Sequence, residues 1–352
     1  MIRFRGAARY AGIVTAGLVV AGTTTAPEPA AVARAVAASP VRAPSMTGFL
    51  DGAAALSARS AFAVGGTQAN DLLILRWNGT AWTRVPAPGP GTGQLNAICA
   101  ISARDAWAVG DTQASTSVIL HWNGTTWKHV PSPQAASPGL QSVTASSARN
   151  AWAVGLDLRG SVIEHWDGTT WKRVPAPGIE LNSVAARSAR DAWAVGQTAG
   201  AGVLILHWNG ATWKRVPAKP GPHPSLSSVA VTSARNAWAV GSNDTGVLIL
   251  HWNGATWKRV PAPAQGELLA VAASSARNAW AVGDDGENSL ILHWNGTTWK
   301  RVPSPKSALA TLFSVTAPSA RTAIAVGVDR NDNPLILRWN GAVWNAQHAP
   351  PV

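Results

Sequence analysis

One unit of sequence occurs seven times in this chain of 352 residues, and this repetition constrains the fold more than any other feature. Each copy contains the tripeptide Ser-Ala-Arg, and the leucines that open successive copies are 41 to 45 residues apart. The copies begin at Leu50, Leu95, Leu140, Leu181, Leu226, Leu268 and Leu312. A period of about 40–45 residues that holds several short strands is typical of a β-propeller blade.

Each copy divides into four short segments with the character of β-strands. In the fourth copy these are 181–186, 192–196, 203–208 and 212–217. The second, AWAVG, has the two-residue alternation of a strand, and Asn-Gly between the third and fourth is a strong hairpin signal. Pro217 ends the fourth segment because proline cannot continue the ladder. The sequence therefore predicts an all-β fold over 50–352, a seven-bladed β-propeller with four antiparallel strands per blade.

Tryptophan is over-represented, with 19 copies against four Phe and one Tyr. Trp208 and Trp213 lie five residues apart across the predicted hairpin, so strand alternation places both rings on one face. Each ring buries roughly 150–250 Å², and we expect the rings to pack one blade on the next. Phe62 replaces the second-strand Trp in the first copy, and Ile324 replaces it in the last. These two end copies are predicted to meet without a shared strand.

The N-terminus has the pattern of a secretory signal peptide. Basic residues precede an apolar run over 11–22, and small residues suited to cleavage follow at 31–33 and 35–37. We assign 1–37 to the signal peptide and its cleavage region, and the Ala- and Pro-rich stretch 38–49 to a linker. The apolar run is shorter than the roughly 20 residues that cross a bilayer. We expect a secreted monomer, extracellular or associated with the cell envelope, without a transmembrane segment.

The repeated sequence DAWAVG…LILHWNGATW resembles the Asp-box (BNR) propellers, which include photosystem II assembly factors and sialidases, and it also resembles exported bacterial repeat proteins. Asp-box propellers carry a similar second strand and the motif D-x-G-x-x-W between the third and fourth strands. The resemblance covers 50–345 and implies the propeller fold, not an activity. Asp167 alone keeps the acidic residue of the motif. Asparagine replaces it at Asn78, Asn123, Asn209, Asn253, Asn295 and Asn340.

Variation between the copies is confined to certain loops. The Ser-Ala-Arg and Trp-Asn-Gly turns hardly change, whereas the loops after Ala-Val-Gly and after Val-Pro differ throughout. A propeller places these two pairs of loops on opposite faces, which we call the constant face and the variable face. A specific site is expected on variable loops held by a rigid support; unconstrained drift of exposed loops is the alternative. The candidate binding residues are Asp111, Arg159, Asn243, Asp244, Asp284, Asp285, Glu287, Asp329 and Asp332.

Two groups of these residues, at 284–287 and 329–332, offer oxygen ligands of the kind that bind cations. Neither group matches a complete calcium-binding loop, and Asp and Asn are common in solvated turns. No metal or other cofactor is therefore predicted.

An arginine follows Ser-Ala in every copy, and we call these seven residues the arginine ring. They are Arg59, Arg104, Arg149, Arg190, Arg235, Arg277 and Arg321. On the constant face they would bind an anionic polymer; alternatively, each guanidinium bonds carbonyl oxygens of the hairpin turn or stacks on a Trp. The structural role is favoured because the arginine is inseparable from the repeat.

Five histidines precede the hairpins, at His121, His165, His207, His251 and His293. Third strands of adjacent blades are too far apart for these residues to share zinc, whose ligands stand near 2 Å from the metal. Each His is expected to face a threonine across the strand.

The sequence favours a binding or scaffold module over an enzyme. Tyr10 is the only tyrosine and lies in the predicted signal peptide, which excludes a sialidase nucleophile and a Tyr–Cys copper site. A carboxylate-dependent glycoside hydrolase would use Glu164 and Asp167, and a lectin would need exposed hairpin tryptophans. The net charge of +12 and export favour an anionic cell-envelope polymer, a glycan or an exported protein as partner, and not nucleic acid.

Overall fold

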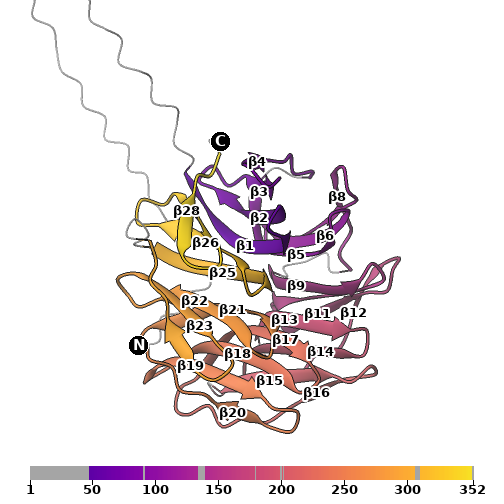
Figure 1. Cartoon of the computed structure of the whole chain (residues 1–352). Coiled ribbons are helices and arrows are strands. Elements are labelled where there is room, and N and C mark those ends of the chain that lie inside the picture. The colour runs from indigo at the N-terminus through magenta and orange to yellow at the C-terminus, as the bar shows by residue number, and fades with distance from the viewer. Residues whose placement is uncertain are drawn as a thin grey trace, which may run out of the picture. The chain divides into compact units, whose positions relative to one another are not determined.

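The computed structural model describes residues 47–350 apart from 90–91, 134–138, 179, 199, 201 and 306–309. The predicted signal peptide, 1–37, and most of the predicted linker lie outside these residues. Within the described part, 28 strands follow one another without a helix. They form seven four-stranded antiparallel sheets, each with its strands in chain order (Figure 1). This confirms the predicted seven-bladed β-propeller.

Each blade begins with its innermost strand, and the fourth strand is the shortest in every blade. The first strands are β1 (Gly48–Ser57), β5 (Gly93–Ser102), β9 (Gly139–Ser147), β13 (Glu180–Ser188), β17 (Ser225–Ser233), β21 (Glu267–Ser275) and β25 (Ala310–Ser319). The second strands are β2 (Ser60–Thr67), β6 (Asp105–Thr112), β10 (Asn150–Asp157), β14 (Asp191–Gln197), β18 (Asn236–Asn243), β22 (Asn278–Asp284) and β26 (Thr322–Asp329).

The third and fourth strands form the hairpins at the outside of the ring. The third strands are β3 (Leu72–Trp77), β7 (Ser117–Trp122), β11 (Gly160–Trp166), β15 (Val203–Trp208), β19 (Gly246–Trp252), β23 (Ser289–Trp294) and β27 (Pro334–Trp339). The fourth strands are β4 (Trp82–Arg84), β8 (Trp127–His129), β12 (Trp171–Arg173), β16 (Trp213–Arg215), β20 (Trp257–Arg259), β24 (Trp299–Arg301) and β28 (Trp344–Gln347).

The first strands begin one or two residues before the leucines that open the repeats. The first blade therefore includes Gly48 and Phe49, which the sequence analysis placed at the end of the linker. The opening leucines are fully buried, so they fix the inner strand against the core rather than mark its first residue.

Serine side chains link the inner strands of neighbouring blades. An inner strand has no partner strand on its channel side, so some of its N–H groups need other acceptors. The Ser183 Oγ accepts a hydrogen bond from the Val229 N–H at 3.2 Å, and Ser228 Oγ accepts one from Val271 at 3.1 Å. Ser142 and Ser314 make the same link to Val184 and Ala53, so four of the seven inner strands are joined to the next one in this way.

The glycine of Ala-Val-Gly sits where the first two strands approach most closely. A Cβ at Gly196 would lie 2.0 Å from the carbonyl oxygen of Glu180, beside a bulge between Leu181 and Ser183. Backbone cannot move aside for a methyl group without breaking the ladder, so only glycine fits. The same approach, 2.0–2.1 Å, occurs in all seven blades, which accounts for this glycine in every repeat.

The core consists of seven clusters, each between two adjacent blades. Trp193 of β14 is 1% exposed, and its ring lies 4.9 Å from Trp252 and 5.1 Å from Trp257 of the next blade. Trp208 and Trp213 are directly opposite each other across their hairpin. These contacts confirm that the tryptophans pack one blade on the next.

The ring closes by packing of the last blade on the first. Ile324 and Val326 of β26 share a cluster with Trp77 and Trp82 of the first hairpin. The Ala53 N–H also donates to Ser314 Oγ at 3.2 Å, and Figure 1 shows the yellow last blade beside the indigo first blade. No strand is exchanged between their two sheets in the described part of the chain, as predicted.

Candidate functional site

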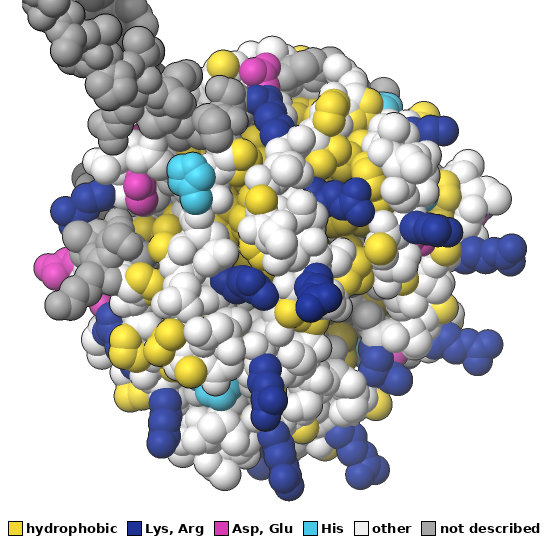
Figure 2. Space-filling view, turned by 45° about the horizontal axis from the view of Figure 1, so that its top comes forward, with side chains coloured by type: hydrophobic (Ala, Val, Ile, Leu, Met, Phe, Trp, Pro, Cys, Tyr) yellow, Lys and Arg dark blue, Asp and Glu magenta, His cyan; other side chains and the backbone are white. Residues whose placement is uncertain are grey.

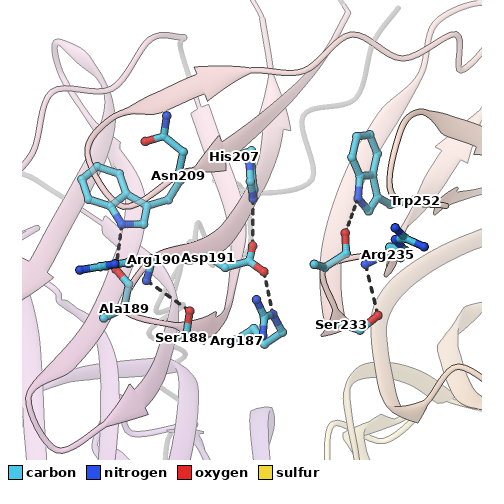
Figure 3. A network of polar contacts seen from close by, with 12 residues as sticks. Arg187, Ser188, Ala189, Arg190, Asp191, His207, Asn209, Ser233, Arg235 and Trp252 are labelled. Carbon is cyan, nitrogen blue, oxygen red and sulfur yellow. Dashed lines mark hydrogen bonds and ion pairs between the residues drawn. The ribbon is translucent and has the colours of Figure 1, made fainter.

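The turns of the constant face are held by a repeated set of hydrogen bonds (Figure 3). In every blade, the Ser-Ala-Arg turn is fixed by its serine Oγ, which accepts the arginine backbone N–H at 3.1–3.3 Å. Trp252 Nε1 donates to the Ala234 carbonyl oxygen at 3.0 Å, which ties the hairpin to that turn. The two kinds of turn therefore form one surface, as expected of a propeller.

The hairpin asparagine accepts the same backbone hydrogen bonds as Asp167, the aspartate retained at this position. Asn209 Oδ1 accepts the backbone N–H groups of Ala211 and Thr212, both at 3.0 Å. Asp167 makes the equivalent bonds to Thr169 and Thr170 at 2.9 and 3.0 Å. Either residue type can supply the accepting oxygen, so the loss of the acidic residue leaves the turn intact.

We expect Asn209→Ala to lower the free energy of unfolding by about 1 kcal/mol, the usual cost of losing a side-chain cap on backbone N–H groups. Asn209→Asp is the matched control and should stay close to the parent, since Asp167 already occupies this position in the third blade. Chemical denaturation of both variants measures the difference. An equal loss in both would show that the oxygen acceptor is not what holds the turn.

The five histidines lie between tryptophan and an Asp or Asn side chain. His207 Nε2 is 2.9 Å from Asp191 Oδ1, and its ring lies 4.3 Å from that of Trp193. The predicted threonine partner is wrong, because the strand register pairs His207 with Trp193 on one side and Lys214 on the other. Burial lowers the pKa of His165, His251 and His293. No cluster of three or more metal-ligating side chains occurs in the part of the chain described.

The guanidinium groups of the arginine ring do not make the contacts expected of a structural role, which were hydrogen bonds to the hairpin turn or stacking on a Trp. All seven arginines are exposed, and within the described residues none forms a side-chain hydrogen bond, ion pair or ring contact. Only the aliphatic stem is held: a Cβ added at Gly210 would lie 3.0 Å from Cγ of Arg190. The stem packs on the hairpin glycine, and the charged end is free.

Each candidate on the variable face belongs to a local turn or contact. Asp111 accepts Asn96 Nδ2 at 2.8 Å, and burial raises its pKa. Asp244 lies 2.6 Å from His223 Nδ1, and Asn243 Oδ1 accepts the Thr245 N–H at 2.9 Å.

The remaining candidates follow the same pattern. The backbone of Arg159 donates to Asp157 at 2.7 Å, Asp284 accepts the Gly286 N–H at 3.1 Å and Asp329 accepts the Asn331 N–H at 2.8 Å. The carbonyl oxygen of Asp332 accepts the Gly48 N–H at 3.0 Å, which helps to close the ring. Arg159, Asp284 and the pair Asp329 and Asp332 lie on three different blades and do not converge on one site.

Asp285 and Glu287 are brought together in a concave site. They border a hollow of about 610 Å³ on the variable face, with Ala262, Pro263, Ala264, Gln265 and Arg301. Asp285 accepts Arg301 Nη2 at 2.5 Å; although partial burial alone would raise the pKa of Asp285, this contact lowers it. Glu287 is exposed at the edge.

Sequence reasoning missed Arg301 and the loop 262–265. Arg301 follows Lys300 in a fourth strand, and its aspartate partner lies 16 residues earlier in the chain, beyond the reach of a local sequence pattern. A smaller hollow, of about 280 Å³, lies in the first blade, where Asp71 and Arg84 meet the loop 86–89 that follows the fourth strand of the same blade. The recurring signal was a proline-containing loop after the Val-Pro that follows the fourth strand in six of the seven copies.

Charge differs between the two faces. On the constant face the described acidic residues are Asp105, Asp167 and Asp191, and each is paired with a His or Lys. Other carboxylates lie at strand ends or loops of the variable face, where fourth-strand arginines neutralise some of them, as Arg173 does the buried Asp157. Figure 2 shows dark-blue basic side chains at many separate points of the visible face, with few magenta ones between them.

The residues named for a glycoside hydrolase or a lectin are not arranged as those functions would require. Glu164 is fully buried, accepts Ser132 Oγ at 2.7 Å and faces no solvent. Asp167 lies in a hairpin turn with Lys172 at 2.6 Å, and the hydrogen bond with Lys172 lowers its pKa. All 19 tryptophans are buried or half-buried. The structure therefore provides neither an accessible Glu164–Asp167 pair nor the exposed tryptophans that a lectin would need.

Comparison with solved structures gives extensive matches. YCF48 bound to a D1 peptide superimposes with a TM-score of 0.62 at 14% identity, covering 85% of this chain and 95% of that chain. YCF48 from Cyanidioschyzon merolae gives 0.59 at 17% identity, covering 85% and 98%. The chain has the fold of a β-propeller. A streptogramin B lyase is also similar, with a TM-score of 0.60 at 16% identity, covering 86% and 95%.

No protein-family model and no curated protein sequence matches the chain. The identities to the solved structures are low, so the likeness is one of fold. Among the described residues there is no helix with the length and apolar character that crossing a membrane requires.

Proposed function

We propose that this chain is an exported, non-catalytic β-propeller that binds a segment of another exported protein through its variable face. The observation that carries the proposal is the hollow of about 610 Å³ beside Asp285 and Glu287. Its lining is mainly polar and charged, with Ala262, Pro263 and Ala264 along one side, and such a lining suits a polar peptide segment with basic side chains. The blade beneath it is rigidly packed, so the site needs little reorganisation on binding.

Two further observations support a protein partner. A propeller of similar fold, YCF48, is known in a complex with a D1 peptide. The variable face also carries carboxylates, Glu287 and Asp244 among them, that would repel an anionic polymer and attract basic side chains. Relationship to the Asp-box propellers is part of the same proposal and is supported by the equivalent turn bonds of Asp167 and Asn209.

A photo-crosslinking residue at Gln265, on the border of the hollow, tests this proposal in the producing cells. We expect one discrete crosslinked protein species. With Glu287→Lys added, its yield should fall about tenfold, as expected for loss of a contact worth roughly 1.4 kcal/mol. The same crosslinker at Thr297, a turn residue of the constant face, is the matched control. Identical species at both positions, or none at Gln265, would overturn the proposal.

Export has its own test. The basic, apolar and small-residue regions of 1–37 support processing by a signal peptidase. The N-terminus of the protein recovered from outside the cell should follow Ala33 or Ala37. Retention of Met1 in all of the protein would contradict export by this signal.

A further inference from the structure

The arginine ring is a repeated positive charge without a partner among the residues that the structure describes. Within the described residues, none of its seven guanidinium groups pairs with a carboxylate or a carbonyl oxygen. The nearby acids are already engaged: Asp191 holds both His207 and Arg187, and Asp167 holds Lys172. The constant face therefore keeps an uncompensated positive charge at every blade.

The ring is also held in position. The serine Oγ fixes the backbone of each arginine, for example Ser233 to the Arg235 N–H at 3.2 Å. The stem of Arg235 packs against the hairpin, where a Cβ on Gly254 would lie 2.7 Å from its Cγ. Gly254 has φ +97°, a left-handed conformation that favours glycine. Fixed stems reduce the rotamer entropy that arginines lose on binding an anion.

We propose that the constant face binds a linear polyanion that carries phosphate groups along its length. Seven like charges of identical setting suit a ligand that repeats its own charge and has no defined sequence. Arginine presents planar donors that match phosphate oxygens in pairs. The hairpin turns beside the ring contain no charged residue in six of the blades. In the third blade Asp167 is paired with Lys172, so these turns add no unpaired negative charge that would repel a phosphate.

The surface favours a polymer over a lipid bilayer. The exposed large apolar side chains of the described residues are Leu156, Leu158 and Val343. Leu156 and Leu158 lie in and beside the β10–β11 loop on the variable face, so only Val343 is available for insertion on the constant face. A flexible chain can follow the ring and bind several arginines at once, which multiplies the affinity. This site lies on the face opposite the proposed protein site and does not depend on it.

Long-chain inorganic polyphosphate is the probe, and the full chain is titrated with it by calorimetry at several salt concentrations. The ring variant combines Arg59→Gln, Arg149→Gln, Arg235→Gln and Arg321→Gln. The control removes the same charge from the variable side with Arg84→Gln, Arg215→Gln, Lys219→Gln and Arg330→Gln. All eight side chains are exposed. Charges on the far side are screened within about 10 Å at 0.1 M salt.

We expect polyphosphate to bind the parent and the control alike, and the ring variant at least about tenfold more weakly and with a shallower salt dependence. Orthophosphate should not compete, because one anion engages one arginine. Polyphosphate should also raise the melting temperature of the parent and not of the ring variant. Without ligand, the ring variant should have the melting temperature of the parent, since the guanidinium groups that it lacks form no hydrogen bond or ion pair with the described residues.

Three results would overturn the proposal. Equal weakening of the ring variant and the control would assign binding to net charge alone. Binding to vesicles of anionic phospholipid, with none to polyphosphate, would assign the face to a membrane. Absence of binding to polyphosphate at low salt would remove the site. None of these results affects crosslinking at Gln265, so the two proposals fail separately.

Discussion

Trp193→Ala is expected to lower the free energy of unfolding by about 4 kcal/mol, within the range for removal of a buried aromatic ring. Trp193 is 1% exposed and connects two blades, with ring distances of 4.3 Å to His207, 4.9 Å to Trp252 and 5.1 Å to Trp257. Its neighbours belong to paired strands and cannot collapse into the space. The cavity therefore persists, and the free energy of unfolding falls by the whole contribution of the lost contacts.

Trp193→Phe is the matched control and should cost about 1–2 kcal/mol. Phe62 fills the same place in the first blade, 5.6 Å from both Trp122 and Trp127. The indole N–H of Trp193 has no hydrogen-bond partner in the described part of the chain. Replacing the indole by a phenyl ring therefore reduces the buried area but breaks no hydrogen bond. Equilibrium denaturation with tryptophan fluorescence and circular dichroism measures both variants. An alanine variant as stable as the phenylalanine one would contradict the packing role.

Glu164→Leu is expected to stabilise the protein by about 3 kcal/mol at pH 8. Burial raises the pKa of Glu164 to about 7, although the Ser132 hydrogen bond and the Arg173 charge oppose the rise. Among the described residues, Oε2 of Glu164 has no hydrogen-bond partner. A group with a pKa raised from 4.5 to about 7 costs about 3 kcal/mol when it ionises in the folded state. Leu206 and Leu250 occupy this position in other blades, fully buried, so leucine fits.

The pH dependence has a definite sign. Below pH 4.5 the carboxyl is protonated in both states and carries no penalty. Between pH 4.5 and about 7 the folded state binds more protons than the unfolded state, so stability falls as the pH rises. Above pH 7 the full penalty is present.

Unfolding free energies at pH 5, 6, 7 and 8 test this for the parent, Glu164→Leu and Glu164→Gln. Both substitutions should remove the Glu164 part of the slope, and only leucine should also remove the buried polar group. Glu287→Gln is the control, because Glu287 is exposed, and should follow the parent at every pH. A slope unchanged in Glu164→Leu would show that other groups cause it.

Much of the fold follows from the repeat alone. The period, the Asn-Gly hairpins and the prolines place four strands in each unit, because these features act within a few residues. The replacement of Trp by Phe62 and Ile324 in the end blades indicated a packing role, which their clusters confirm. The sequence also indicated which loops share a face, since strand direction alternates along each blade.

Contacts between elements were decided only by the tertiary structure. The partner of His207 depends on the register of β14 and β15, and a shift of one residue would turn every side chain to the other face. In the sequence, Glu164 is an isolated replacement of the leucine of the repeat. The structure shows that its carboxyl is buried and accepts a hydrogen bond from Ser132, 32 residues away. The hollow arises where the loop 262–265 meets Arg301 and Asp285.

The distribution of charge shows the same division. The composition fixed a positive net charge of +12, but not where that charge lies. The topology of the blade decides the face on which Asp157 and Arg190 each lie. Side chains that meet across the sheet decide whether each of these charges is neutralised. Local sequence determines elements because backbone preferences act over short range. Sites depend on the tertiary structure because hydrogen bonds, ion pairs and cavities require groups distant in sequence to meet within a few ångströms.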